Sequence, residues 1–509
     1  MEYRLGRCGA LVHLLVEANK LNGVACAMRI LAIVVVLLLA PALDLAAQNP
    51  RLELGRRLQR FENAWEAAPA RRRDATVAYL RDAVGSFFAL RLSEAGRQMD
   101  NAWLAVRSDD LPSALTRAMI GSQLLVSPLC AETGDEPLKL QLESFYETGI
   151  EPEPGAVAHL RLRRATGELL AEAEYAIPEL AGGTSWQLQQ IPEGDHQLSV
   201  VIRHKDTTFA LPSITISRIT ELNRRLQKID DAAVSLRAEA RSGDVESSDD
   251  TLVATLRNEK RLIEDVMEGL SQEADFPLLH RLKSCEAMLA TRSKPIGFAK
   301  RLSESKEAWL TLANGRKSVP TRVHLPRGTG KPAPVLFVFH GAGGSENMFF
   351  ETYGAGRVVR EAAKRGWIVI SPRQGLLGMP LDINDMLDAL EPYTSLDRKR
   401  VMLLGHSMGA SQAVQQVRKH PTLPVATVAL GGGGRLSESD AQRSRGVSWF
   451  IGAGDQDFGL ATGKQLNRRL TATESVVRMK VYKNIEHLVV VQAAIDDAFE
   501  FLDKVLAEL

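Results

Sequence analysis

Short apolar runs that alternate with helical stretches constrain the fold of residues 296–509 more than any other feature. The runs are "PVLFVFHG", "WIVISP", "RVMLLGHS", "PVATVALGG", "SWFIGAG" and "VVRMKVY", and stretches such as "RVVREAAKRG" and "ASQAVQQVRKH" separate them. Strands that are apolar on both faces and alternate with helices are typical of a doubly wound, mostly parallel sheet. The sequence therefore predicts an α/β domain, opened by a hairpin over "EAWLTLANGRKSVPTRVHLP", with ligands at the carboxyl ends of its strands.

Two other periodicities mark the part of the chain before residue 296. Apolar residues recur at helical intervals over residues 48–125 and again over 218–295, which predicts two helical arms. Over residues 126–217 the period changes to two, and turn signals such as "EPEPG" and "PEGD" separate the apolar runs. We therefore expect a small β-sandwich-like domain inserted between the arms, which could pack on each other as a bundle.

The N-terminal 47 residues have the pattern of an export signal. Ile30–Ala40 is an unbroken apolar run that is too short to span a bilayer but suits the core of a secretory signal peptide. We expect residues 1–47 to be a signal peptide cleaved after Ala47, and the protein to be secreted or periplasmic. Met28 could be the true start, because a charged segment normally opens such a peptide. The alternative is a short membrane anchor, because the segment down to Leu45 could reach a marginal span.

Charge and cysteine content narrow the classes of partner. The chain has 63 Lys and Arg residues against 62 Asp and Glu residues, so no net field attracts nucleic acid or an anionic membrane. No Cys/His cluster has the spacing of metal ligands, and we expect neither a metal nor a cofactor. Cys130 and Cys285, which remain after cleavage, could form a disulfide or lie separately in the core.

Ser407 lies where a predicted strand meets a predicted helix. It follows the strand "RVMLL" and precedes a helix that begins near Ala410. Gly405 and Gly409 leave no side chains where strand and helix crowd together, so a tight turn would raise the Ser407 hydroxyl above the sheet edge. A G-x-S-x-G match alone is weak, but this setting predicts a nucleophile.

A serine hydroxyl needs a base within hydrogen-bond reach, and two histidines follow Ser407. His420 ends the helix that Ser407 begins, which places it about 20 Å away along the axis. His487 follows the last predicted strand and precedes the final helix, on a loop at the same edge as Ser407. By elimination, His487 is the expected base.

The acid is expected after the strand in "VSWFIGAGDQDF", where two aspartates qualify. A strand of usual length reaches Gly454 and makes Asp457 the acid, whereas a strand two residues shorter would use Asp455. We favour Asp457, whose role would be to orient the imidazole and stabilise its charged form.

Two backbone amides are candidates for stabilising an oxyanion. The amide of Met408 opens the helix after Ser407. The glycine-rich turn in "FVFHGAGGSENMFF" follows the first long parallel strand and could supply a second amide, from Ala342 or Gly343. No Lys or Thr follows this turn at the spacing of a phosphate-binding loop.

Residues from about 300 to 509 resemble α/β-hydrolases. The motifs "HGAGGSENMFF", "RGWIVISP", "DRKRVMLLGHSMGA", "GAGDQDF" and "IEHLVV" are similar in order and spacing to secreted esterases of the polyhydroxyalkanoate-depolymerase and feruloyl-esterase type, and to the catalytic domains of prolyl-oligopeptidase-like enzymes. The resemblance implies Ser407 as the nucleophile, His487 as the base and Asp457 or Asp455 as the acid. It also implies that the amides of Met408 and of Ala342 or Gly343 are the oxyanion donors. The part before residue 296 lacks the repeats of a propeller.

We therefore expect a secreted serine hydrolase that cleaves small or polymer-borne carboxylic esters through an acyl-enzyme. One alternative is a serine peptidase of the prolyl-oligopeptidase-like type. Another is an envelope polysaccharide-binding protein, in which the β-domain contacts carbohydrate and the hydrolase domain is auxiliary. Residues 433–446 leave no room for an inserted cap, so the pocket is either open or covered by the N-terminal helices and the β-domain.

Overall fold

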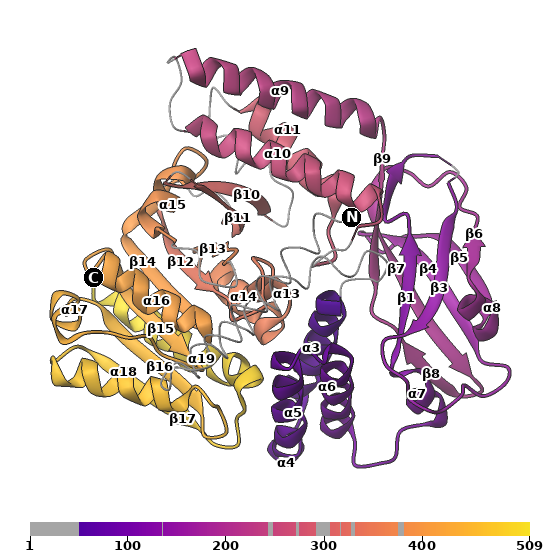
Figure 1. Cartoon of the computed structure of the whole chain (residues 1–509), viewed down its shortest axis with the longest axis horizontal. Helices are drawn as coiled ribbons and strands as arrows, with labels where there is room; N and C mark the ends of the chain where they lie inside the picture. The colour runs from indigo at the N-terminus through magenta and orange to yellow at the C-terminus, as the bar shows by residue number, and fades with distance from the viewer. Residues whose placement is uncertain are drawn as a thin grey trace, which may run out of the picture. The chain divides into compact units, whose positions relative to one another are not determined.

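The computed structural model describes residues 50–134, 136–242, 248–270, 274–291, 306–315, 317–326, 331–374 and 381–509 (Figure 1). The expected signal peptide at residues 1–47 lies outside these ranges. Within them, every helix is too short or too polar to cross a lipid bilayer.

The α/β domain is built on an eight-stranded sheet, which confirms the doubly wound fold. Its strand order is β10-β11-β13-β12-β14-β15-β16-β17, in which β10 and β11 form the predicted antiparallel hairpin and β12 to β17 run parallel. The strands are β10 (Glu307–Asn314), β11 (Lys317–His324), β12 (Ala333–Phe339), β13 (Ile368–Pro372), β14 (Leu396–His406), β15 (Pro424–Leu430), β16 (Ser448–Gly454) and β17 (Val477–Tyr482).

Helices cover both faces of this sheet because its strands are apolar on both sides. One hydrophobic cluster joins one face of the sheet to α14 (Arg357–Lys364) and α19 (Val490–Ala507). A second cluster joins the other face to α15 (Ile383–Leu390), α16 (Met408–Lys419), α17 (Glu438–Arg443) and α18 (Leu460–Ala472). Short helical turns, α13 (Met348–Glu351), η4 (Tyr353–Gly356) and η5 (His487–Val489), follow β12 and β17.

Two sheets over residues 122–219 have the arrangement of a β-sandwich. Their inner faces bury alternate apolar residues in one cluster, as the period of two predicts. The smaller sheet has the order β1-β3-β6, and the larger has the order β2-β9-β7-β4-β5, with β8 paired to β7. The strands are β1 (Ser122–Ser127), β2 (Cys130–Glu132), β3 (Leu138–Ser144), β4 (Val157–Arg164), β5 (Leu169–Ala176), β6 (Thr184–Trp186), β7 (Gly194–His204), β8 (Thr207–Ala210) and β9 (Ile214–Ile219), and α8 (Ile177–Gly182) follows β5.

The two helical segments pack in different cores. Helices α3, α5 and α6 pack side by side (Figure 1) and belong to the cluster that contains α14 and α19. Helices α9, α10 and α11 belong to the cluster that contains α15 to α18, and α10 lies on β10. The helices are α3 (Pro50–Ala67), α4 (Ala70–Asp74), α5 (Val77–Phe88), α6 (Leu92–Arg107), α7 (Ala114–Met119), α9 (Leu222–Ser242), α10 (Ser248–Met267) and α11 (Leu278–Ala290).

The expectation that the arms form one bundle is therefore wrong. Helix α3 packs on α6 and the η4 turn and α5 packs on α6 and η5, whereas α10 and α11 pack on β10, so the two arms belong to different hydrophobic clusters. Cys130 and Cys285 are free and buried, so the disulfide alternative is not realised. The domain boundaries expected at residues 126, 218 and 296 stay predictions.

Candidate active site

The backbone at Ser407 has a conformation that non-glycine residues rarely adopt. Ser407 lies between the end of β14 and the start of α16, with φ 57° and ψ −118°. Its amide donates a hydrogen bond to the carbonyl oxygen of Leu430 at 2.9 Å, which ties the turn to β15. The Ser407 hydroxyl does not cap the helix that follows it. A strained backbone of this kind is typical of functional turns, and it leaves the hydroxyl available for chemistry.

Two glycines make this turn possible. A Cβ atom at Gly405 would overlap the carbonyl oxygen of Gly409, and a Cβ atom at Gly409 would overlap the carbonyl oxygen of Phe339. The strand and the helix therefore approach more closely around Ser407 than any side chain would allow.

A histidine and a carboxylate meet at the same edge of the sheet. His487 follows β17 on η5, and its Nδ1 lies 2.7 Å from Oδ1 of Asp457, which follows β16. Because an ionised carboxylate only accepts hydrogen bonds, Nδ1 donates the proton and Nε2 remains an acceptor. The imidazole therefore has the tautomer that a general base requires.

Asp457 is held as an anion despite its burial. Burial alone would raise the pKa of Asp457, but the hydrogen bond and charge of His487, together with the Gly459 amide, lower the pKa below its usual value. The Gly459 amide donates to Oδ1 of Asp457 at 2.6 Å. Asp455 is exposed and accepts a hydrogen bond from the Asn484 amide at 2.8 Å. The structure thus brings Asp457, and not Asp455, beside His487.

The glycine-rich turn after β12 passes next to Ser407. A Cβ atom built at Gly341 would lie 3.3 Å from the Ser407 Cβ atom. Ala342 and Gly343 line the same cavity as Ser407, and Met408 is the first residue of α16. The first amides of a helix have no intrahelical partner, so they can donate to an anion.

His340 orients this turn. Burial lowers the pKa of His340 to about 4, so its ring is neutral. Its Nε2 accepts a hydrogen bond from the Gln374 amide at 2.9 Å, and its Nδ1 therefore donates to the Gly341 carbonyl oxygen at 2.8 Å.

The sequence analysis missed two aromatic neighbours of His487. His406 lies directly before Ser407, and its Nε2 donates to the backbone carbonyl oxygen of His487 at 3.0 Å. Burial, followed by the charge on His487, lowers the pKa of His406 to about 3, so it stays neutral and positions the loop. The ring of Phe458 lies 3.9 Å from the ring of His487. In the sequence, His406 directly precedes Ser407 and Phe458 directly follows Asp457. This adjacency is the signal by which both could have been found.

Helices of the N-terminal arm cover the cavity that contains Ser407 and His487. This cavity has a volume of about 100 Å³. The apolar side chains that line it come from α3, α5 and α6, and Arg51 of α3 lines it as well: the apolar ones are Leu54, Leu58, Ala83, Val84, Phe87, Phe88 and Met99. Phe87 packs against the glycine-rich turn, because a Cβ atom at Gly343 would be 2.5 Å from its ring. Of the cover that the sequence allowed, the N-terminal helices line this cavity, and the β-sandwich contributes none of its described lining residues.

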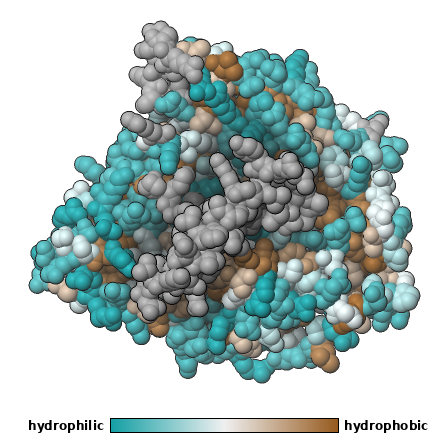
Figure 2. Space-filling model, in the orientation of Figure 1, coloured by the Kyte–Doolittle hydropathy of each residue, from teal (hydrophilic) through white to brown (hydrophobic). Residues whose placement is uncertain are grey.

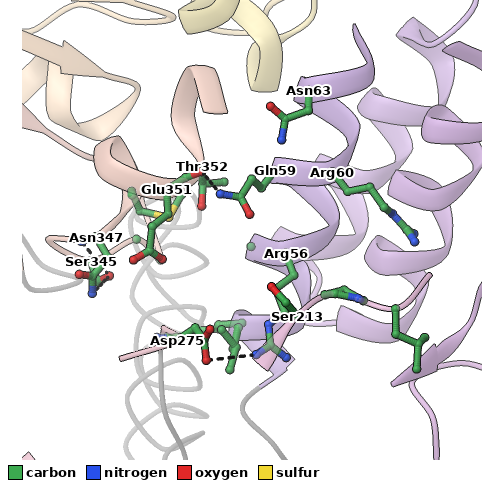
Figure 3. A pocket seen from close by; sticks show the side chains of 18 of the residues that line it. Arg56, Gln59, Arg60, Asn63, Ser213, Asp275, Ser345, Asn347, Glu351 and Thr352 are labelled. Atoms are coloured by element: carbon green, nitrogen blue, oxygen red, sulfur yellow. Dashed lines mark hydrogen bonds and ion pairs between the residues drawn. The ribbon is translucent and has the colours of Figure 1, made fainter. Parts of the chain in front are cut away.

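A second, polar cavity of about 500 Å³ adjoins the first (Figure 3). The two share Gly343, Gly344 and Met348 in their walls. Figure 3 shows Arg56 directed at Asp275, with the guanidinium 3.6 Å from the carboxylate, and Gln59 directed at the α13 turn. Within the described ranges, no cluster of His, Cys, Asp and Glu side chains could hold a metal ion.

A model of the alpha/beta hydrolase family matches residues 335–496. Residues 335–496 have the α/β-hydrolase fold. The match contains β12 to β17 and the three residues Ser407, Asp457 and His487.

Solved structures similar to this chain include three hydrolases. A thermostable esterase is 15% identical over 39% of this chain, with a TM-score of 0.35, and the match covers 63% of that protein, which is less than two thirds. A ferulic acid esterase is 18% identical over 39% of this chain and 98% of its own, with a TM-score of 0.34. A fluorophosphonate-binding serine hydrolase from Staphylococcus aureus is 15% identical over 38% of this chain and 96% of its own, with a TM-score of 0.32.

Adding one methyl group to the turn tests its packing. We expect Gly409→Ala to lower the free energy of unfolding by at least about 1–3 kcal/mol, because the new Cβ atom would overlap backbone that cannot move away. Chemical denaturation followed by circular dichroism measures the change. Gly446→Ala is the control, because a Cβ atom there meets nothing within 4 Å. Equal stability of the two variants would contradict the packing described for the turn.

Proposed function

We propose that this chain is a serine hydrolase that cleaves carboxylic esters through an acyl-enzyme formed on Ser407. The observation that carries the proposal is the His487–Asp457 hydrogen bond beside the cavity that also exposes the strained Ser407 turn. A hydroxyl, a buried carboxylate and an imidazole in this order along an α/β-hydrolase sheet are the parts that acyl transfer requires.

The reaction follows from the positions of these groups. The Ser407 oxygen attacks the ester carbonyl carbon while Nε2 of His487 takes the hydroxyl proton, and Asp457 stabilises the imidazolium. The imidazolium then gives its proton to the leaving alcohol, and the acyl group stays on Ser407. Water, deprotonated by His487, then attacks the acyl carbon, the bond to the Ser407 oxygen breaks as that oxygen takes the proton back from the imidazolium, and the acid is released. The amide of Met408 and that of Ala342 or Gly343 would stabilise the oxyanion in both steps.

The covered cavity favours a small apolar ester over a polymer or a peptide. Its volume of about 100 Å³ is small against the roughly 300–1,000 Å³ of pockets that hold drug-sized ligands. The apolar side chains of α3 and α5 would gain free energy by contact with a hydrocarbon group but would leave the peptide groups of a bound chain unpaired.

The alternative of a polysaccharide-binding protein has less support. Sugar-binding surfaces usually present exposed aromatic rings. In the β-sandwich, Tyr146, Trp186 and Phe209 are buried, and Phe145 and Tyr175 are partly buried against the core. On the face in Figure 2, outside the grey residues, hydrophobic side chains are scattered among hydrophilic ones.

We also propose that residues 1–47 direct export of the protein, because they contain the apolar run of a signal peptide.

A fluorophosphonate probe tests the nucleophile. We expect the probe to label the protein, and Ser407→Ala to abolish both labelling and ester hydrolysis, because the variant lacks the hydroxyl that attacks the probe and the ester. Mass spectrometry of the labelled peptide identifies the modified residue. Ser411→Ala is the matched control, because this serine lies on the same helix and donates to the Gly433 carbonyl oxygen. Labelling that persists in Ser407→Ala would reject the proposal.

Two aspartate variants separate the acid from its neighbour. We expect Asp457→Asn to lower kcat by about 10³- to 10⁴-fold, because an amide in place of the carboxylate favours the wrong tautomer of His487. Asp455→Asn should change kcat by less than about 3-fold, since its carboxylate only accepts from the Asn484 amide. Steady-state hydrolysis of p-nitrophenyl acetate measures both. The reverse order of effects would make Asp455 the acid.

Esters of graded length test the covered cavity. We expect short p-nitrophenyl esters, of about two to four acyl carbons, to give a higher kcat/KM than those of about twelve, since each carbon that does not fit loses binding free energy. Phe87→Ala should raise the long-to-short ratio of kcat/KM by about 10-fold, because it enlarges the cavity. Tyr79→Ala, on the same helix but outside the cavity wall, should leave the ratio unchanged. A wild-type preference for long esters would contradict the small cavity.

A further inference from the structure

The turn at η4 is strained and has three consecutive left-handed residues. Gly354 has φ 61° and ψ 27°, Ala355 has φ 47° and ψ 41°, and Gly356 has φ 74°. A side chain at either glycine would overlap Ile495 or the backbone at Phe350. Ala355 carries a Cβ atom in a region that such residues avoid, so the surrounding structure must hold the turn in place.

A carboxyl group from the N-terminal arm holds this turn. Glu62 lies on α3 and is fully buried, and its Oε2 accepts a hydrogen bond from the Ala355 amide at 2.6 Å. Burial raises the pKa of Glu62 well above its usual value. A buried carboxyl group is costly to bury without hydrogen bonds, so the bond from the Ala355 amide ties α3 to the turn.

The turn begins with a tyrosine that reaches the centre of the site. The ring of Tyr353 lies 4.7 Å from the ring of His406. A Cβ atom built at Gly341 would lie 2.8 Å from the Tyr353 hydroxyl and 3.3 Å from the Ser407 Cβ atom. Tyr353 therefore supports the first glycine of the turn that carries Ala342 and Gly343.

We propose that Glu62 is a positioning residue for catalysis, which holds Tyr353 against Gly341 and so places the oxyanion turn beside Ser407. This inference rests on the proposed function. It makes α3 part of the catalytic framework, in addition to its role as a cover for the cavity. The chemical step is sensitive to such support, since a misplacement of about 1 Å can cost about 100-fold in rate.

Substitutions at Glu62 and Tyr353 test this inference. Glu62→Ala removes the hydrogen bond to the Ala355 amide, and we expect kcat per active site to fall by about 10- to 100-fold with KM within about 2-fold. Glu62→Gln keeps an oxygen that can accept from the same amide, and should stay within about 3-fold of the wild type. Tyr353→Phe keeps the ring but loses the hydroxyl on Gly341, and should lower kcat by about 10-fold.

Glu66→Gln is the matched control. Glu66 lies one turn further along α3, and its carboxylate contacts Arg357 and Gln492, not the η4 amides. We expect no change in kcat beyond about 2-fold for this variant.

The measurement is p-nitrophenyl acetate turnover per active site, with the sites counted by fluorophosphonate titration of the full chain. A role in stability alone would reduce the fraction of titratable sites and the melting temperature but leave kcat per site unchanged, and that result would overturn the inference. If Glu62→Ala does not fold, Tyr353→Phe decides: a wild-type kcat per site would overturn the inference. Absence of labelling in the wild type would instead reject the proposed function.

Discussion

The close approach of β14 and α16 around Ser407 is the constraint on which the site depends. Only glycine fits at positions 405 and 409, and the hydrogen bond from the Ser407 amide to Leu430 fixes the turn to the neighbouring strand. The left-handed backbone of Ser407 is unfavourable in isolation. It persists because β14 is held between β12 and β15 in the centre of a sheet buried on both faces.

The other groups of the site are placed by the same sheet. The turn after β12, Asp457 after β16 and His487 after β17 all lie at one edge, because these strands run parallel to β14. Two buried histidines at this edge carry no charge, and one buried aspartate does. His340 and His406 are neutral because burial lowers their pKa values, whereas Asp457 stays ionised because it accepts from His487 and Gly459. His340 and His406 therefore add no positive charge beside Asp457 and His487.

Strand positions were predictable from sequence because strands buried on both faces are uninterrupted apolar runs. The rule that parallel strands end at one edge then placed Ser407 and His487 near each other. It did not distinguish Asp455 from Asp457, since both follow β16 within three residues, and the turn after Gly454 decides which carboxylate is buried.

Contacts between distant segments were not predictable in the same way. A helical period shows which face of α3 is buried, but not that the face lies on the η4 turn instead of on α9 to α11. The roles of Glu62 and Tyr353 also carry no periodic signal, because Glu62 makes its polar contact with a residue 293 positions away and Tyr353 reaches Gly341 from an irregular turn. For the same reason, the sequence did not reveal that the N-terminal helices, and not the β-sandwich, line the cavity at Ser407.

The bond from Glu62 to Ala355 joins residues 293 positions apart, and Glu66 and Gln492 are 426 positions apart. Pairings between such remote residues form late in folding, because a long loop must close first. During synthesis, helix α3 leaves the ribosome long before the η4 turn and α19, which it contacts. A nascent chain would therefore have no working centre until α19 has been made, which delays hydrolysis to a late stage of synthesis.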